Sequence, residues 1–506
     1  MSTTKWLREM DWFWLAVLLL GLGSIIWLTE YVRKKINLSV SITRKLVHML
    51  TGIFISSTPF LIHDRIPLLV VSGLFTIVNI VAIHRGWMPG LHKTERKTYG
   101  TVFYPLSFFI LTLLLWDGYK SILVISMLIM ALGDAFAAII GEHVQSPANY
   151  KISGEQKSLQ GSFAMFGMSF LIIFGGLSFL SSTIDHIQVS PFHALWYALI
   201  ISLIVTACEA LSYRGSDNLS VPLSAAFFIH YVISHSVADN LAFSFGVGLA
   251  LLIAAVSIYL KFLKGSGAVS TFLLGAVVFG VGRWEFSLPL LLFFVLSSIL
   301  SKLGKQWKAR FADTFQKGGK RDLGQVLANG GLGGLLVVLW NFFPNDGIYL
   351  AFVGSIAAVT ADTWGTEIGV FSKIMPRHII DFRKVPPGTS GGVTLLGFLG
   401  GLAGSLVIVY VSKFATTRYD EYLWVLPLII VAAGVFGSIV DSIVGATIQA
   451  QFKCPNCGKI TEKHIHCENY ATVLHSGIEL IDNDVVNAIC AFSGAAFAYA
   501  AYLLMI

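Results

Sequence analysis

The sequence predicts an all-α polytopic membrane protein with about 16 transmembrane helices in two parallel, repeated halves. Composition, apolar segments and loop charges each favour this fold class. Of the 506 residues, 55% are hydrophobic and 12% are charged, and the mean hydropathy is +0.74. A soluble chain would carry roughly 25% charged residues. The composition therefore excludes an ordinary soluble globular protein.

The apolar segments are long enough to cross a hydrocarbon core of ~30 Å as helices. They lie near 11–29, 46–62, 66–84, 101–117, 120–141, 161–180, 192–213, 221–235, 239–262, 266–282, 286–302, 324–342, 347–371, 391–412, 422–448 and 484–505. The first has Asp11 before its apolar run and a cluster of basic residues after it, at 33–35. We therefore expect a retained helix and not a cleaved signal peptide.

Basic residues alternate between successive loops, which predicts the topology. Lys and Arg are concentrated in one set of alternate loops, for example at 33–35, 93–97 and 302–321. By the positive-inside rule these loops face the cytosol and both termini lie outside. The same rule accounts for the net charge of +7. A nucleic-acid partner is not expected, because the basic residues lie in short loops.

Similar features recur at an offset of eight predicted helices, which indicates an internal repeat. Gly133-Asp134-Ala135 with Gly141 is matched by Ala361-Asp362-Thr363 with Gly369. The loops that follow end in Lys157–Ser162 and in Gly388–Gly392. An even offset keeps both copies in the same orientation. We expect domains at 1–235 and 236–506, the second with a cytosolic Cys/His loop at 450–482.

Each half places carboxylates near the cytosolic ends of its helices. A charged residue inside a membrane helix costs about 2.5–3.5 kcal/mol and usually faces a polar cavity. Such carboxylates suit Mg²⁺, which binds one or two of them together with substrate phosphates. The alternative is structural pairing with a neighbouring Lys or Arg. The candidate catalytic residues are Asp134, Glu209 and Asp217 in the first half, and Asp362, Glu367, Asp441 and Asp482 in the second.

Basic side chains and Gly/Ser loops accompany these carboxylates and suit phosphate oxygens. The candidates for nucleotide binding are Arg44, Lys45, His48, Arg96, Lys97, Lys157, Ser158 and Asn218, then Lys320, Arg321, Asn329, Thr389, Ser390, Gly391 and Asn483. Together these groups are typical of phosphoryl transfer. Because no G-x-x-x-x-G-K-[ST] sequence occurs, a nucleotide site would not be a P-loop. A site at the cytosolic rim could reach a soluble nucleotide and a lipid head group.

Three of the five cysteines fall within a short loop, which favours a metal site over a disulfide framework. The spacing of Cys454 and Cys457, followed by His464, His466 and Cys467, is similar to that of a zinc ribbon. We expect a bound Zn²⁺ to brace the second half rather than to act in catalysis.

Residues 30–235 resemble the dolichol kinase and phytol kinase family. The likeness rests on Arg44-Lys45-Leu46-Val47-His48, Gly133-Asp134-x-x-Ala137, Lys157-Ser158-x-x-Gly161-Ser162, and Glu209 followed by Asp217-Asn218 and Pro222. Members phosphorylate isoprenoid alcohols, typically with CTP. The resemblance implies that Asp134 and Lys157 lie at the nucleotide–metal site, with Glu209 and Asp217 close by. The family often has Glu where this chain has Gln160.

Residues 240–506 resemble the membrane family that includes plant phytyl-phosphate kinase. The matching stretches are Gly265–Ala268, Lys320–Gly331, Ala361–Gly369, Gly388–Thr394 and Asp482–Asn487. This likeness implies phosphorylation of an isoprenyl monophosphate to the diphosphate. The two halves would then convert a prenyl alcohol to a diphosphate in two steps.

Three alternatives remain open at this stage. The first-half pattern also resembles phosphatidate cytidylyltransferases, which transfer CMP to a lipid phosphate. A transporter of an anionic lipid would use the carboxylates to move protons and would turn over no nucleotide. One half could also be inactive and act as a scaffold for the other. The sequence does not distinguish CTP from ATP or UTP.

Overall fold

The computed structural model describes residues 2–85, 98–303, 320–416, 425–467 and 470–505. These residues divide into two compact helical units, Met1–Asn240 (unit 1) and Leu241–Ile506 (unit 2). The boundary falls inside helix α13, Val237–Tyr259. The first turn of α13 is held to unit 1, because Asn240 donates hydrogen bonds to the Tyr197 hydroxyl at 2.8 Å and to the Val232 carbonyl at 2.7 Å.

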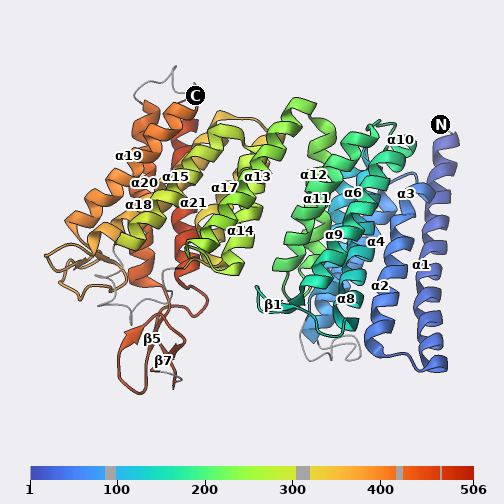
Figure 1. Cartoon of the computed structure of the whole chain (residues 1–506), viewed down its shortest axis with the longest axis horizontal. Coiled ribbons are helices and arrows are strands. Elements are labelled where there is room, and N and C mark those ends of the chain that lie inside the picture. Colours follow the sequence, from blue (N-terminus) through green and yellow to red (C-terminus); the bar gives the residue numbers. More distant parts are fainter. Residues whose placement is uncertain (1, 86–97, 304–319, 417–424, 468–469, 506) are drawn as a thin grey trace. The chain divides into compact units, whose positions relative to one another are not determined.

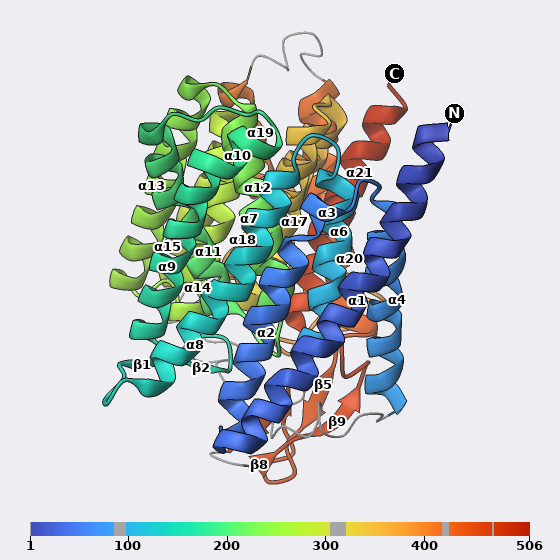
Figure 2. The same ribbon diagram turned by 90° about the vertical axis from the view of Figure 1, so that its right-hand side faces the viewer.

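Unit 1 is a bundle of helices with one short hairpin (Figure 1). Its elements are α1 (Ser2–Ile36), α2 (Val40–Ser56), α3 (Thr58–Leu61), α4 (Ile66–Arg85), α6 (Gly100–Leu115), α7 (Lys120–Leu128), the π-helical turn η1 (Ile129–Gly133), α8 (Asp134–His143), β1 (Asn149–Lys151), β2 (Gln156–Ser158), α9 (Leu159–Gly175), η2 (Gly176–Leu180), α10 (Ser181–Ile184), α11 (Pro191–Leu211) and α12 (Asp217–Ser234). Helix α1 packs along α2 and α4 (Figure 2).

Unit 2 is a second bundle with three further small sheets. After α13 come α14 (Gly265–Gly275), η3 (Ala276–Val281), α15 (Arg283–Leu303), α17 (Leu323–Phe342), α18 (Asp346–Gly369), β3 (Arg377–His378), β4 (Gly392–Val393), α19 (Leu395–Ala415), α20 (Val425–Thr447), β5 (Gln451–Lys453), β6 (Ile460–Thr461), β7 (Ile465–His466), β8 (Tyr470–Ala471), β9 (Val473–Ser476) and α21 (Asn483–Leu503). Strands β5 and β7 lie beyond one end of these helices (Figure 1).

The predicted helical membrane fold is confirmed, with a smaller number of long apolar helices. All of the predicted apolar segments coincide with helices, and among the described residues 12 helices are long and apolar enough to cross a membrane. Two shorter apolar helices lie at Gly100–Leu115 and Gly265–Val281. The remaining two predicted spans, α2 and α12, carry the polar candidates Arg44, Lys45 and His48, and Asp217 with Asn218.

The central helix of each unit leads directly to a candidate aspartate. In unit 2 every residue of α18 from Tyr349 to Ala361 is buried, and Asp362 follows. In unit 1 every residue from Ser121 to Ala131 except Leu128 is buried, and Asp134 opens α8 just beyond. Because buried apolar helices pack closely in protein interiors, the backbone that positions Asp134 and Asp362 is rigid.

Candidate functional site

In unit 1, Asp134 is placed by an irregular turn of its own helix. The π-helical turn Ile129–Gly133 ends immediately before it, and such turns often occur at functional sites. The Met130 carbonyl lies 3.4 Å from His48 Nε2, and the same nitrogen lies 3.9 Å from Asp134 Oδ2. Among the described residues, none donates a hydrogen bond to the Asp134 carboxylate, whose side chain is 30% exposed. Its oxygens are therefore open to a ligand.

Lys157 is the best-anchored cation of this cluster. It stands on the β1–β2 hairpin and forms an ion pair with Glu209, and it also donates to the Glu209 carbonyl and, at 2.7 Å, to the Ser212 hydroxyl. Burial opposes the charge of Lys157, but the carboxylates of Glu209, Asp217 and Asp134 together outweigh burial and raise the pKa of the ammonium group above its usual value. Lys157 therefore remains positively charged.

Asp217 and Asn218 join the cluster from the start of α12. Asp217 Oδ1 accepts hydrogen bonds from the backbone N–H and the side-chain amide of Asn218, at 2.9 and 3.1 Å. Asp217 Oδ2 accepts one from the Ser212 hydroxyl at 3.3 Å. The charges of Asp217, Glu209, Lys157 and Lys45 all act on Asp134. The structure therefore brings the predicted acids of the first half together around one point.

The other first-half candidates have more varied places. Lys45 forms an ion pair with Glu142, and the charge of Arg44 acts on His48. Ser158 caps α9 by accepting a hydrogen bond from the Gly161 N–H at 3.1 Å. Arg96 and Lys97 lie outside the described residues.

In unit 2, Asp362 on α18 and Asp441 on α20 meet directly. Each carboxyl group acts electrostatically on the other, and two buried carboxyl groups so placed favour a shared proton or a cation between them. Asp441 Oδ2 is buried and has no hydrogen-bond partner among the described residues. Glu367 lies five residues after Asp362 and accepts a hydrogen bond from the Ser301 hydroxyl at 2.7 Å. Three of the four predicted second-half acids therefore lie on two packed helices.

Arg321 lines a mostly apolar pocket in unit 2. Its backbone is held by hydrogen bonds to Phe262 and Lys264, and its guanidinium lies over the rings of Phe293 and Phe294 at 5.5 and 5.6 Å. Desolvation lowers the pKa of Arg321 to about 10, against the opposing charge of Glu367, so it is charged at neutral pH.

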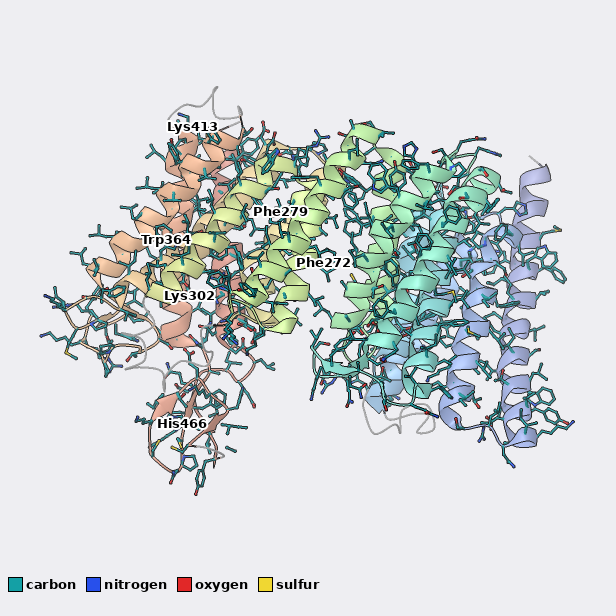
Figure 3. The ribbon with its side chains drawn as sticks, in the orientation of Figure 1. Phe272, Phe279, Lys302, Trp364, Lys413 and His466 are labelled. Carbon is teal, nitrogen blue, oxygen red and sulfur yellow. The ribbon has the colours of Figure 1, made fainter. Side chains whose placement is uncertain are left out.

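The pocket beside Arg321 has an empty volume of about 480 Å³, which includes space open to solvent. Most of its lining is apolar and comes from α14, η3, α15 and α17. One of these lining residues is Phe279 of η3, which Figure 3 labels. Its polar lining residues are Thr271, Arg321, Gln325 and Asn329. Thr271 Oγ1 and Gln325 Oε1 are buried without a hydrogen-bond partner in the part of the chain that the structure describes.

Most of the remaining second-half candidates form hydrogen bonds away from the Asp362–Asp441 pair. Asp482 caps α21 by accepting from the N–H groups of Asp484 and Val485, and Asn483 is the first residue of that helix. Asn329 donates to the Gln325 carbonyl, Thr389 to the Pro386 carbonyl and Ser390 to Glu462. Gly391 has a positive φ of 75°, and Lys320 is exposed. No contact joins Asp482 to the Asp362–Asp441 pair among the described residues.

In the Cys/His loop, Cys454, Cys457, His466 and Cys467 lie together. His464 lies outside this group, because its ring packs on Phe452 with centroids 4.4 Å apart. Figure 3 labels His466 within the strands beyond the helices of unit 2.

Comparisons with known proteins place the chain among membrane proteins. The model of the family described as integral membrane protein DUF92 matches residues 248–495. Protein PGR of Arabidopsis thaliana is 35% identical over 265 residues, covering 48% of this chain and 90% of that protein. The chain belongs to the DUF92 family. Phytol kinase of Synechocystis sp. is 31% identical to this DUF92-family chain over 224 residues, covering 42% of the chain and 89% of that protein.

Phytol kinase 1 of Arabidopsis thaliana is 28% identical over 223 residues, covering 40% of the DUF92-family chain and 70% of that protein. No solved structure matches the chain. The resemblances inferred from the sequence, to phytol kinases and to the family that includes phytyl-phosphate kinase, are confirmed.

Several residues of the site carry no clear signal in the sequence. Ser212 bridges Lys157 and Asp217 but is one of many serines at helix ends. Tyr104 lies in an apolar helix, yet its ring meets that of His48 edge-on at 5.4 Å. Its hydroxyl is buried without a hydrogen-bond partner within the described ranges. Glu142 could have been found from its spacing, because it lies two turns after Asp134 on the same helix.

Proposed function

We propose that this DUF92-family protein is a membrane kinase acting twice on one isoprenoid lipid. Unit 1 would phosphorylate an isoprenoid alcohol to the monophosphate, and unit 2 would phosphorylate the monophosphate to the diphosphate. CTP is the proposed donor, and both sites would open on the cytosolic side of the membrane. The observation that carries the proposal is the gathering of Asp134, Glu209, Asp217 and Lys157 in a chain related to proteins named phytol kinase.

The donor set of unit 1 fits a magnesium–nucleotide. Asp134 offers carboxylate oxygens that no described donor occupies, and Asp217 lies within electrostatic range of it. Oxygen ligands of this kind suit Mg²⁺, which retains water and binds substrate phosphates as well. Bound there, Mg²⁺ would neutralise the charge that develops on the transferred phosphoryl group.

The remaining groups have roles in positioning and proton transfer. The alcohol oxygen attacks the terminal phosphorus of the nucleotide, the bond to the bridging oxygen breaks, and the nucleoside diphosphate leaves. The hydroxyl proton would pass to a carboxylate of the cluster that does not bind the metal, and the Asp134 carboxylate would remain the metal ligand. His48, between the Met130 carbonyl and Asp134, would orient that carboxylate. Lys157, fixed by Glu209 and Ser212, would supply positive charge at the phosphates.

The pocket of unit 2 supports a substrate that is apolar at one end and anionic at the other. Its walls are mostly aliphatic and aromatic, and Arg321 is the one charged residue among the described residues that line it. Thr271 can donate its hydroxyl hydrogen, and an amide flip lets Gln325 present its NH₂ group. A phosphate bound by these groups would place an isoprenoid tail along the apolar wall. The Asp362–Asp441 pair, with its unpartnered oxygen, fits Mg²⁺ on the same chemical grounds as Asp134.

Matching helix starts support the proposed parallel repeat. Ser158 caps α9 through the N–H of the residue three positions on, Gly161, and Thr394 caps α19 through Gly397 in the same manner. The helix that follows the hairpin therefore has the same type of N-cap in both units. On this pairing Ser158 would correspond to Thr394, which lies two residues beyond the Gly388–Gly392 stretch matched in the sequence.

The test supplies the purified protein with each nucleoside triphosphate and with a panel of isoprenoid alcohols and monophosphates. Asp134→Asn should abolish alcohol phosphorylation and spare monophosphate phosphorylation, and Asp362→Asn should do the reverse. Loss of both activities in both variants would overturn the two-site proposal. Release of pyrophosphate with a CDP-lipid would instead identify a cytidylyltransferase, and absence of nucleotide turnover would favour a transporter.

A further inference from the structure

Four side chains of the Cys/His loop already have the spacing of metal ligands. The sulfur atoms of Cys454, Cys457 and Cys467 and a ring nitrogen of His466 all lie within 4.8 Å of one another. His466 Nδ1 is 3.4 Å from Cys457 Sγ and 3.2 Å from Cys467 Sγ. Tetrahedral zinc, with bonds of about 2.3 Å to sulfur and about 2.1 Å to nitrogen, holds its ligand atoms roughly 3.5–3.8 Å apart.

The backbone presents these ligands from two hairpins. In the first, the Gly458 N–H donates to the Cys454 carbonyl at 2.9 Å and the Cys454 N–H donates to the Lys459 carbonyl at 3.0 Å. Gly458 has a positive φ of 71°, so the chain turns tightly between β5 and β6 and carries Cys457 back to Cys454. The second pair, His466 and Cys467, stands at the end of β7, in the β7–β8 hairpin.

This segment has little apolar core of its own. Its strands are 2 to 4 residues long. Ile465 is 62% exposed and Val473 is 65% exposed, whereas Phe452 and Cys454 are buried. Small units with so little buried surface usually require a metal or disulfides to fold, and all three cysteines here are free thiols.

We propose that Cys454, Cys457, His466 and Cys467 bind a structural Zn²⁺, and that the bound metal fixes Glu462 against the Gly388–Gly392 loop of unit 2. Glu462 lies in the chain between the two ligand pairs. Its Oε1 accepts hydrogen bonds from the Ser390 hydroxyl at 3.1 Å and from the Gln449 amide at 2.8 Å. With both flanking hairpins tied to one ion, the position of Glu462 is determined by the metal.

The loop that Glu462 holds adjoins the helix of Asp441. Gly391 packs so closely on α20 that a Cβ atom there would lie 2.9 Å from the Ser442 carbonyl oxygen. The charge of Glu462 also acts on Asp441. Glu462 is therefore a positioning residue, which acts through Ser390. The zinc site stands without the proposed function, whereas the importance of the loop for phosphorylation rests on it.

Metal analysis of the purified full-length protein tests the site directly. We expect about one zinc ion per chain in the wild type, and none in Cys454→Ser or Cys457→Ser. Cys208→Ser, which changes a cysteine of unit 1, should retain the metal. A wild-type protein without zinc, or one in which mass spectrometry finds a disulfide between Cys454 and Cys457, would overturn the proposal.

Hydrogen exchange of residues 388–392 tests the positioning part without any substrate. Removing zinc with a chelator should increase the exchange rate of this loop several-fold. Glu462→Ala should do the same while the zinc content stays unchanged, and Glu462→Gln, which keeps an acceptor for Ser390, should restore protection. Unchanged exchange after zinc removal would refute the coupling. Because neither measurement uses a nucleotide or a lipid, a failure of the kinase proposal would not affect them.

Discussion

Gly161 lies against the backbone of Ala137, so closely that a Cβ atom on Gly161 would stand 2.8 Å from the Ala137 carbonyl oxygen. In unit 2, a Cβ atom on Gly397 would stand 2.8 Å from the carbonyl oxygen of Gly365. Ala137 and Gly365 each lie three residues after a candidate aspartate, Asp134 and Asp362. The helix that carries each aspartate is thus crossed at the same point by the helix that follows its hairpin. Glycine is required there because the two backbones touch.

The Gly161→Ala variant should lose stability and alcohol phosphorylation together. The added methyl group would push α9 away from α8, and overpacking of this kind costs about 1–3 kcal/mol. The matched control is Gly167→Ala in the same helix, where nothing lies within 4 Å of the added Cβ. Thermal unfolding in detergent and the alcohol kinase assay measure the two effects. Equal behaviour of the two variants would show that the crossing is not critical.

Removing one partner of the Lys157–Glu209 pair should be more harmful than removing both. Their side chains are only 13% and 9% exposed, and an unpaired buried charge costs about 3–5 kcal/mol. We expect Lys157→Met to destabilise the protein strongly and Lys157→Met/Glu209→Leu to recover part of that loss. Alcohol phosphorylation should stay absent in both, because Lys157 would contact the phosphates. An active double variant would mean that the pair is purely structural.

Arg321→Met should impair the monophosphate reaction through KM. Loss of charge-assisted hydrogen bonds worth about 1.5–3 kcal/mol corresponds to a KM increase of roughly 10- to 150-fold. The KM for the nucleotide should stay unchanged. Lys302→Met is the control, because Lys302 lies over the Phe262 ring, donates to the Leu260 carbonyl and does not line the pocket. A variant whose nucleotide KM rises instead would place Arg321 at the donor.

The Gly391→Ala variant should lose monophosphate phosphorylation, an effect that backbone strain at position 391 alone would not cause. Any residue other than glycine at a positive φ costs about 1–3 kcal/mol, and here the Cβ would also press on α20. Gly118→Ala separates the two effects, since Gly118 has a φ of 93° with nothing within 4 Å. We expect monophosphate phosphorylation to fall only in Gly391→Ala. If both variants lose equal stability and keep activity, contact with α20 does not matter.

The sequence predicts those parts of the structure that depend on residue type and spacing. The helices follow from apolar runs, and the acids Asp134, Glu209 and Asp217 are found because charge inside a membrane helix is costly. Local backbone geometry was harder to foresee. Asp482 caps α21, and Thr394 caps α19 as Ser158 caps α9, since hydrogen bonds to the first turn of a helix depend on conformation.

Long-range partners are missed for a similar reason. Glu462 reaches Ser390 across 72 residues of chain, and Glu142 reaches Lys45 across 97. Neither pair has a periodicity or a motif, so only the folded chain joins them. His464 has the same residue type as His466 and a suitable spacing, but its ring packs on Phe452 instead of joining the three cysteines of the loop.

The burial of α18 from Tyr349 to Ala361 limits where the proposed lipid specificity of unit 2 could be altered. A helix enclosed on all sides cannot shift or accept larger side chains without disturbing every neighbour. Leu274 on α14 and Leu291 on α15 line the pocket and are only half-buried. Enlarging or filling these positions should therefore change tail-length preference while Asp362 stays in place.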